Sequence, residues 1–574
     1  MQEKRWVYRN EEYDKNAIIE TAEKLSVSPV LLTLLYNRGI YNPDEMRTFM
    51  SKSLKLVHDP LGLPDMDKAA ERIYKAVTNN EKIYIYGDYD VDGITSTAII
   101  YKYLLSHGAD VSYYIPDRVE EGYGMNILAI NKISKTGCKL IITVDCGVTS
   151  VGEIELAKAQ GMDVIVTDHH TCKEKLPAAT AVVNAKRHDS QYPFTELAGA
   201  GVALKTVLAL SAHFGESAKD VFYKYVMLAA IGTVADVVPL VDENRTIVDR
   251  GVSELTMTDS KGIKSLLRVA GVKEVTSGSI AFAIAPRINA AGRVDNASVA
   301  VELLLCEDRN RADELADILN VDNNHRRAEE KRIYDEAVAL AEKDPDIKNK
   351  KVIVLAGEAW HHGVIGIVAS RICEKYYKPT VILSHENGIA KGSCRSIDGF
   401  NMFDALTECD DLLDKFGGHA LAAGLALKTK NIEAFSEKIN KYGKDVMGDT
   451  NPVPEIRIDC RVSPSTLTID KIKMLSSMEP FGQGNEEPIF SIDRAKILTS
   501  MQIGEEKNHL RLQIQKGECV LSCIAFRMGE YIDELSPGSL IDVAFTPEIN
   551  TYNGRRSVQL RVRDIKKSKK TERM

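Results

Sequence analysis

The sequence lacks the features of an exported or membrane-bound protein. Its 10 cysteines form no CxxC pair and no regular framework, which indicates reduced thiols rather than disulfides. No apolar run approaches the ~18 residues that a bilayer-spanning helix needs. The charged N-terminus, MQEKRWVYRNEEYDKN, has no apolar signal region. We therefore expect a cytoplasmic protein without a membrane segment.

An excess of basic residues is also missing. The formal net charge of -8 argues against a surface that coats nucleic acid, but not against an enzyme with a local basic groove. The apolar fraction of 44% and the charged fraction of 27% are those of ordinary globular proteins. A chain of 574 residues is too long for one hydrophobic core, so three or four domains are expected.

Hydrophobic patterning divides the chain into six segments. Short apolar, β-branched runs alternate with amphipathic helical stretches from Lys82 onward, which predicts a parallel sheet covered on both faces. A charged region with apolar residues at helical spacing predicts one long connector helix. Short, evenly spaced strands near the end predict a small antiparallel barrel. The segments are a helical accessory part (1–55), the first α/β domain (56–307), the connector (308–345), a second α/β domain (346–452), the barrel (453–566) and a basic tail (567–574).

Acidic residues and two histidines recur where the apolar runs of the first domain end. They are Asp88, Asp90, Asp92, Asp145, Asp168, His169, His170 and Asp236. Each aspartate alone is explained as a turn or helix-cap residue. Together they should converge, because ligands of an open parallel sheet bind outside the carboxyl ends of its strands.

The chemistry of this set favours a metal centre. Carboxylates with one imidazole suit Mn²⁺ or Mg²⁺, whereas thiolates would favour zinc. Several packed carboxylates repel one another unless cations lie between them. Two ions sharing one carboxylate could clamp the attacking and leaving oxygens of a phosphoryl displacement.

The same motifs resemble a known superfamily. GDYDVDG, VDCG, DHH and ADVVPL resemble, in order, the four motifs of the DHH phosphoesterases. PRINAAGR, GVIGIVASRI, KGSCRS, FGGHALAAG and EPFGQGNEEPIF are similar to RecJ-type exonucleases, over nearly the whole chain. The resemblance implies an α/β fold: a parallel-sheet DHH catalytic domain, a DHH-associated second domain and an OB-fold barrel. His362 departs from the pattern, because proline is expected there.

The resemblance also implies roles for the clustered residues. Asp92, Asp145, His169 and Asp236 match the ligands of one ion. Asp88 and Asp90, with Asp145 bridging, match a second, and which of Asp88 and Asp90 ligates directly is left open. Asp168 would orient an imidazole, and His170 would face the scissile phosphate, so that His170, Asp145 and Asp168 carry the catalysis.

Substrate contacts are implied for a further set of residues. Ser393 and Arg395, placed on a loop, and Arg118, Arg287 and Arg293 would form a pocket for a terminal 5′-phosphate. Gly417 and Gly418 would bring backbone N–H groups close to a phosphate, and His419 would contact the substrate phosphate across the cleft. Tyr123 would stack on a base. The alternatives are solvated arginines, a tight turn before a packed helix, and loop packing of Tyr123.

The implied activity is a two-metal 5′-to-3′ exonuclease that hydrolyses single-stranded DNA to 5′-mononucleotides in repair and recombination. The chain is expected to act as a monomer, with a single-strand-binding protein or a RecQ-like helicase as candidate partners. One alternative is a phosphodiesterase for nano-RNA or cyclic dinucleotides, which would not need a strand-guiding barrel. Another is a non-catalytic replication scaffold, which would have lost metal ligands.

Overall fold

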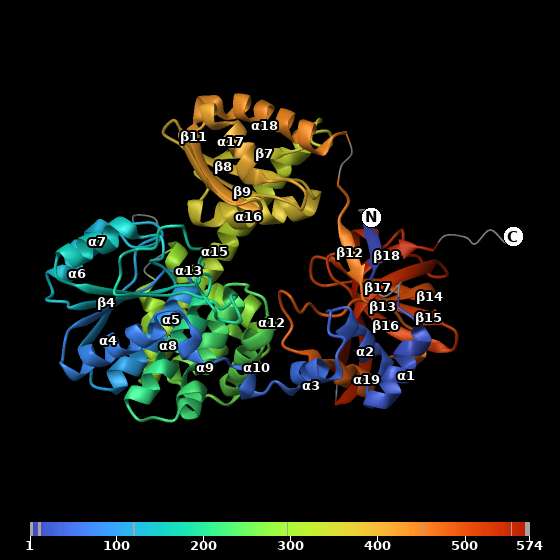
Figure 1. Cartoon of the computed structure of the whole chain (residues 1–574). Coiled ribbons are helices and arrows are strands. Elements are labelled where there is room, and N and C mark those ends of the chain that lie inside the picture. Colours follow the sequence, from blue (N-terminus) through green and yellow to red (C-terminus); the bar gives the residue numbers. More distant parts are fainter. Residues whose placement is uncertain are drawn as a thin grey trace.

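The computed structural model describes residues 4–9, 13–118, 121–294, 297–449, 452–552 and 554–568, with only the backbone of 293 and 294. Most of the expected basic tail therefore lies outside the described residues. Figure 1 shows three bodies: the first α/β domain, which the resemblance implies is catalytic and which is called the catalytic domain below, a second α/β domain above it, and a barrel beside both. Among the described helices, none combines the length and apolar character required to span a membrane.

The catalytic domain is built on a five-stranded sheet with the order β3-β2-β4-β5-β6 and parallel pairing throughout. Its strands are β2 (Ile83–Tyr86), β3 (Val111–Tyr114), β4 (Leu140–Val144), β5 (Asp163–Thr167) and β6 (Ala181–Val183). All five coincide with the apolar runs of the sequence. The strand order reverses between β2 and β4, the place where open α/β sheets bind ligands.

Helices cover both faces of this sheet and extend it into a helical layer. They are α4 (Met66–Thr78), α5 (Val91–Ser106), α6 (Ile127–Ser134), α7 (Val151–Ala159), α8 (Gly199–His213), α9 (Ala218–Ala235), α10 (Asp242–Met257), α11 (Lys261–Ala270), α12 (Ser277–Ser279), η3 (Ile280–Ile284), α13 (Ala285–Val294) and α14 (Ser298–Leu305). The helix α5 packs against both α8 and α9 in one continuous apolar core.

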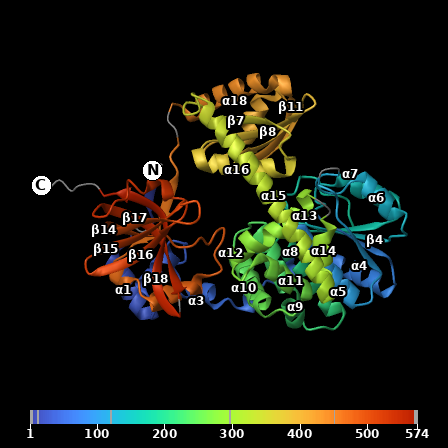
Figure 2. The ribbon, with the colours of Figure 1, turned by 180° about the vertical axis from the view of Figure 1, so that it is seen from behind.

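The connector is the single helix α15 (Arg309–Lys343), which Figure 2 shows running from the catalytic domain into the second domain. Its first half contributes Leu315 and Leu319 to the catalytic core, and its second half contributes Ile333 and Ala337 to the core of the second domain. Since both ends are buried in different cores, α15 couples the two domains through packing.

The second domain has a mixed sheet of order β10-β11-β9-β8-β7, in which only β7 and β8 are parallel. Its elements are β7 (Ile353–Glu358), α16 (His362–Tyr376), β8 (Thr380–Glu386), β9 (Ile389–Arg395), α17 (Met402–Glu408), β10 (Lys415–Gly418), β11 (Ala422–Lys428) and α18 (Ile432–Met447).

The C-terminal barrel closes through the pairing of β14 with β17. It is not wholly antiparallel as expected, because β16 pairs with β18 in parallel. The strands and the barrel helix are β12 (Glu455–Ile458), β13 (Cys460–Arg461), α19 (Ile469–Leu475), β14 (Phe490–Ile503), β15 (His509–Lys516), β16 (Cys519–Ala525), β17 (Leu540–Tyr552) and β18 (Arg555–Lys567).

The N-terminal segment packs on this barrel rather than standing alone (Figure 1). It comprises β1 (Arg5–Tyr8), α1 (Lys15–Leu25), α2 (Pro29–Tyr36) and α3 (Pro43–Ser51). Strand β1, in a stretch expected to be helical, pairs in parallel with β12, and the Trp6 Nε1 donates to Asp564 at 2.7 Å. Leu32 and Leu34 of α2 share one core with Phe490 and Phe545 of the barrel.

We expect Leu34→Ala to destabilise the barrel, although the two are more than 400 positions apart. Truncating a fully buried leucine typically lowers the free energy of unfolding by about 2–5 kcal/mol. The chain has 2 tryptophans, so in a Trp360→Phe background Trp6 fluorescence reports barrel unfolding by denaturant. Ile19→Ala, at an α1 position that is 45% exposed, is the control. An unchanged Trp6 transition in Leu34→Ala would mean that the segment is not part of the barrel's fold.

Candidate metal centre

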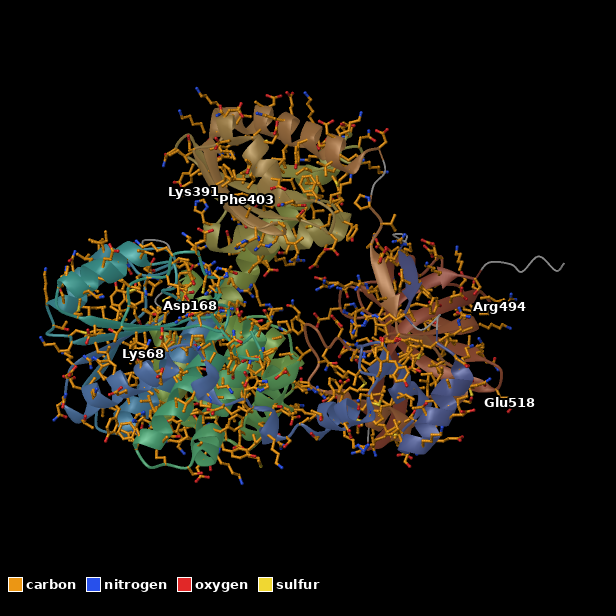
Figure 3. All side chains as sticks on the ribbon, in the orientation of Figure 1. Lys68, Asp168, Lys391, Phe403, Arg494 and Glu518 are labelled. Atoms are coloured by element: carbon orange, nitrogen blue, oxygen red, sulfur yellow. The ribbon has the colours of Figure 1, made fainter. Side chains whose placement is uncertain are left out.

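The metal centre lies at the carboxyl edge of the parallel sheet, at the reversal between β2 and β4. Asp145 directly follows β4, and Asp168, His169 and His170 directly follow β5. Asp88 lies two positions beyond the end of β2. Figure 3 shows Asp168 in the upper part of the catalytic domain, below the second domain that carries Lys391 and Phe403.

One imidazole nitrogen faces three carboxylates. His169 Nε2 lies 3.1 Å from Asp145 Oδ1, 3.6 Å from Asp236 Oδ2 and 3.7 Å from Asp92 Oδ2. His169 is buried, and neither of its ring nitrogens has a hydrogen-bond partner among the described residues. A buried polar atom left without a partner is costly, so this arrangement fits a cation held by all four side chains.

A second group of oxygen ligands shares Asp145 with the first. Carboxylate oxygens of Asp88, Asp90 and Asp145 lie within 4.8 Å of one another. Asp88 Oδ1 is buried and has no hydrogen-bond partner among the described residues. Asp90 Oδ1 instead caps α5, accepting from the Asp92 and Gly93 N–H groups at 2.8 and 3.1 Å. Asp88 Oδ1 is therefore more available to a metal ion than Asp90 Oδ1.

Helix α8 and two glycines hold Asp92 in place. Both oxygens of Asp92 accept N–H groups from the first turn of α8, Gly199 at 2.6 Å and Ala200 at 2.9 Å. A helix N-terminus favours such an anion. A Cβ on Gly199 would lie 2.9 Å from Asp145 Oδ1, and one on Gly232 would lie 2.6 Å from Asp92 Oδ1. Only glycine fits at these two positions.

Asp168 positions the neighbouring histidine. Its Oδ1 accepts from His170 Nδ1 at 2.8 Å and from the His169 N–H at 2.7 Å, and its Oδ2 accepts from the Val148 N–H at 2.9 Å. The Tyr123 hydroxyl lies 3.1 Å from His170 Nδ1 and donates to the Asp145 carbonyl at 3.2 Å. Tyr123 is thus more than a loop-packing residue: it contacts the centre directly, with half of its side chain exposed.

The electrostatics of the centre follow from packing acids together in a dry site. Burial, with Asp90 nearby, raises the pKa of Asp88 to about 8. Burial and the negative charge of Asp236 raise the pKa of Asp92 to about 7. Burial and the negative charge of Asp90 raise the pKa of Asp236 to about 7. The pKa of Asp145 is raised well above its usual value by burial and then by Asp92. A divalent cation would remove this repulsion.

Asp236 reaches the site from a helix, which corrects its expected place at a strand end. It caps the C-terminus of α9, whose last residues, IGTVA, are as apolar as a buried strand. A short apolar run does not distinguish the two structures. Val237 next to it has a φ of 61°, and Asp145 has a φ of 58°. Such strain tends to persist where the surrounding structure enforces it, often at functional sites.

The arginines expected to bind phosphate differ in how their donors are used. Arg287 donates to Asn320 Oδ1 at 3.0 Å and to the Ala283 and Val269 carbonyls at 2.6 and 3.2 Å, which favours a structural role. Arg118 stacks over Tyr89 at 4.9 Å, and its charge acts on Asp88. The Arg293 side chain lies outside the described residues.

Ser393 and Arg395 lie on strand β9 rather than on a loop. Arg395 Nη1 donates to Ser393 Oγ at 3.2 Å and to the Cys394 carbonyl at 2.7 Å. In the described part of the chain, no carboxylate pairs with Arg395, although burial lowers its pKa. A Cβ on Gly366 of α16 would lie 3.1 Å from Ser393 Oγ, so this glycine keeps the space beside the pair open.

Gly417 and Gly418 end β10, and exposed His419 starts the turn into β11. A strand therefore follows, not the packed helix considered as the alternative. Gly418 has a φ of 141°, and a Cβ there would lie 2.5 Å from the Ala422 carbonyl. The turn thus requires glycine for its backbone, while Gly417 has open space around it.

Sequence reasoning missed two asparagines that hold the centre. The Asn184 Nδ2 donates to the His170 carbonyl at 2.9 Å, directly after β6. Asn289 Oδ1 accepts the Val91 N–H at 3.2 Å. The first was findable, because Asn184 ends an apolar run like the aspartates do. The second was not, because α13 meets α5 only in the folded chain.

Fold and metal centre together define a divalent-metal phosphoesterase of the DHH class. Three family models match the chain: the N-terminal domain of the DHH family over residues 82–233, the DHHA1 domain over 349–445 and the RecJ OB domain over 458–564. The chain belongs to the RecJ family of single-stranded-DNA-specific exonucleases.

Relatives and a solved structure support this assignment over nearly the full length. RecJ of Bacillus subtilis is 38% identical, covering 98% of this chain and 70% of its own length. RecJ of Escherichia coli is 34% identical, and the match covers 96% of this chain and 98% of that relative. The crystal structure of Thermus thermophilus RecJ in complex with Mn²⁺ superposes with a TM-score of 0.83 at 30% identity, covering 99% of this chain and 80% of that one.

We expect Mn²⁺ to stabilise the protein more at about pH 8 than at about pH 5. Without metal, the unfolded carboxylates ionise near pH ~4, whereas folded Asp88, Asp92 and Asp236 keep their protons to pH 7–8. Their stabilising contribution is present below pH ~4 and is lost as the pH rises through the folded values. Bound cations reverse that loss.

Thermal unfolding in EDTA and in Mn²⁺ at both pH values measures this effect. The Mn²⁺-dependent rise in Tm should be larger at the higher pH, and Asp145→Asn should lose most of it. Equal rises at both pH values would show that the clustered carboxylates are not what the ion neutralises.

Proposed function

We propose that this chain is a two-metal-ion 5′-to-3′ exonuclease that hydrolyses single-stranded DNA to 5′-mononucleotides and acts in DNA repair and recombination. The observation that carries the proposal is the sharing of Asp145 between two ligand groups, one around His169 Nε2 and one with Asp88 and Asp90. The RecJ relatives, named as single-stranded-DNA-specific exonucleases, support the substrate.

The ligand groups fit Mn²⁺ or Mg²⁺, since they consist of carboxylates and one imidazole. Asp92, Asp145, His169 and Asp236 would hold one ion, and Asp88, Asp145 and the free oxygen of Asp90 the other. Two such cations would neutralise charge on the phosphodiester and make water a better nucleophile. RecJ of Thermus thermophilus has been crystallised with each of these ions.

The remaining residues of the centre would orient the substrate. Asp168 fixes the ring of His170 through its Nδ1, so the other edge of the imidazole can donate to an oxygen of the scissile phosphate. The ring of Tyr123, held by its hydroxyl against the same histidine, offers an exposed face to the terminal base.

Direction of digestion requires a feature that recognises one chain end, because a two-metal site hydrolyses any phosphodiester bond placed in it. We assign this role to Arg395 and Ser393, with Arg118 as a third contributor. Arg395 is a half-buried cation with an adjacent hydroxyl and without a carboxylate partner among the described residues. These are the properties of a site for a terminal 5′-phosphate.

The barrel favours a long strand over a dinucleotide as substrate. It exposes Tyr552, Arg511, Arg555 and Arg556. Arg561, on the same barrel, is neutralised by Glu487 and Glu548. A monomeric state, and a single-strand-binding protein or a RecQ-like helicase as partners, belong to the same proposal.

We expect digestion of single strands and of 5′ overhangs, stalling near a duplex junction, because a centre between two domains admits one strand more readily than a duplex. Asp145→Asn, which preserves size but removes the shared ligand charge, should abolish cleavage. Gel analysis of strands labelled at either end measures both the preference for single strands and the activity of the variant. Equal rates on blunt duplex and single strand, or near-normal activity of the variant with Mn²⁺, would refute the proposal.

Arg395→Ala should remove the preference for a 5′-phosphate over a 5′-hydroxyl while leaving the metal centre intact. A charge-assisted bond contributes roughly 1.5–3 kcal/mol, so end binding should weaken by about 10- to 100-fold. The comparison uses two oligonucleotides that differ only at the 5′ end, with Mn²⁺ binding of the variant as the control. If the variant retains the preference, the end is recognised elsewhere.

A further inference from the structure

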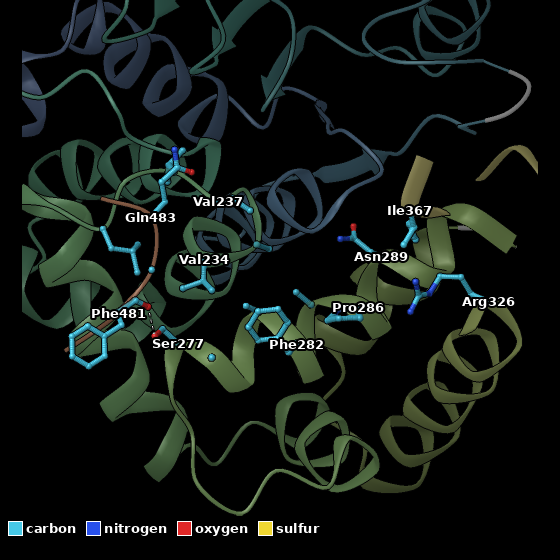
Figure 4. A pocket seen from close by; sticks show the side chains of 17 residues that line it. Val234, Val237, Ser277, Phe282, Pro286, Asn289, Arg326, Ile367, Phe481 and Gln483 are labelled. Carbon is cyan, nitrogen blue, oxygen red and sulfur yellow. Dashed lines mark hydrogen bonds between the residues drawn. The ribbon is translucent and has the colours of Figure 1, made fainter. Parts of the chain in front are cut away.

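A charged cavity lies at the junction of the second domain and the barrel. It differs from the cavity in Figure 4, which is lined mainly by apolar side chains such as Val234 and Phe282 and includes Val237, next to the ligand Asp236. The junction cavity has a volume of about 1040 Å³, and most of its lining residues are charged. Its described lining residues include none from the catalytic domain, so it is separate from the metal centre.

The walls of the junction cavity belong to two bodies. Figure 1 shows β12 where the chain passes from the second domain into the barrel. Tyr377 and Asp398 form the wall that belongs to the second domain. The other wall consists of residues 4–6, β12 and the end of β18, together with Pro452 and Val453 of the linker. A ligand in the cavity would therefore contact both bodies at once.

The cavity has an excess of positive charge in a protein whose net charge is -8. Its lining contains the basic residues Lys4, Arg5, Arg457 and Lys566. Arg5 pairs with Glu455. In the described part of the chain, none of the other three cations forms an ion pair. Unpaired cations that face one cavity favour an anionic ligand.

Trp6 and Asp564 place Lys566 at the cavity. The Trp6 Nε1 donates to Asp564 at 2.7 Å, and Lys566 Nζ lies 4.9 Å from the centre of the Trp6 ring. The charges of Lys4 and Lys566 both act on Asp564, which is buried. Since a lysine ammonium has three donors, both lysines retain donors for an anion in the cavity.

Tyr377 provides an aromatic ring and a hydroxyl on the wall of the second domain. It ends α16 with a φ of 50° and a ψ of 51°, a left-handed conformation that helices usually give to glycine. Backbone strain of this kind often occurs at functional sites. The charge of Asp398 acts on Tyr377. This wall thus offers a ring that can stack on a base and a carboxylate that can accept a hydroxyl or an N–H group.

We propose that the junction cavity binds a free nucleoside 5′-monophosphate. Arg457, Lys4 and Lys566 bind its phosphate, and the base lies against Tyr377. The cavity is at the upper end of the range of ligand sites, about 300–1,000 Å³, so a mononucleotide fits with room for water. The choice of ligand rests on the proposed function, because a mononucleotide is the product of that reaction. Bound product would link the second domain to the barrel, which gives the enzyme a way to respond to accumulated product.

The fluorescence of Trp6 provides a readout at the cavity itself. The chain has 2 tryptophans, so Trp360→Phe leaves Trp6 as the only one. In the full-length, Mg²⁺-loaded protein, deoxyadenosine 5′-monophosphate should quench the Trp6 emission along a saturating curve. Arg457→Ala should raise the Kd by about 10- to 100-fold, the effect of one lost charge-assisted bond. Arg457→Lys should retain most of the affinity, because the positive charge remains.

Three controls separate this cavity from the 5′-phosphate site and from general surface charge. Arg395→Ala should leave the quenching unchanged, because Arg395 lies on β9 and does not line the cavity. Arg527→Ala is the matched control, since Arg527 is an exposed arginine of the same barrel outside the cavity. Deoxyadenosine without a phosphate should not quench at the same concentrations.

Three results overturn the inference: no saturable quenching by the mononucleotide, quenching that Arg457→Ala leaves unchanged, or quenching that Arg395→Ala abolishes. Quenching by a 5′-hydroxyl oligonucleotide that the mononucleotide does not displace would assign the cavity to the strand and also overturn it. Each of these results is compatible with normal digestion of single strands. Failure of the proposed function is detected separately, by gel analysis of labelled strands.

Discussion

The mutual repulsion of buried carboxylates is the constraint on which the rest of the catalytic domain depends. Asp88, Asp92 and Asp145 are nearly inaccessible to solvent, and their pKa values are raised first by burial and then by the neighbouring carboxylates. The chain holds them by geometry rather than by neutralisation: glycines at 199 and 232 allow the close approach, and the first turn of α8 donates to Asp92. The fold therefore holds the carboxylates in the arrangement that a divalent cation needs for binding.

Much of this arrangement could be predicted from the sequence, because the parallel sheet dictates it. Apolar runs that end in aspartate marked β2, β4 and β5 correctly, and strand ends of one parallel sheet must meet at one edge. Asp236 was included in the set for the wrong reason, since the last turn of a buried helix is as apolar as a strand. Its contribution depends on α9 packing against α5, which no local pattern encodes.

Long-range packing explains the other differences. Nothing in residues 1–55 indicates that α2 completes the core of a barrel more than 400 positions away. The pattern of an amphipathic helix shows that one face is buried, but it does not show which part of the chain that face packs against. The parallel β16–β18 pair arises from barrel closure, not from strand composition. In contrast, α15 was predictable to within a few residues, since the helical periodicity over its 35 residues is a local pattern.

Arg287 and Arg395 show why residue type alone did not identify the phosphate ligands. Both were candidates, with the alternative of a solvated charge weighing more against Arg287, and Arg287 indeed directs all three of its nitrogens to oxygens of the protein. Arg395 donates from one nitrogen only, in the described structure, and has no acid beside it. A half-buried cation without a carboxylate beside it is suited to receive an anionic ligand, which is why Arg395 is the one proposed to bind phosphate. Arg287 is committed to the scaffold because its guanidinium donates to the Ala283 carbonyl in the π-helical segment Ile280–Ile284 and to the Val269 carbonyl and Asn320 nearby.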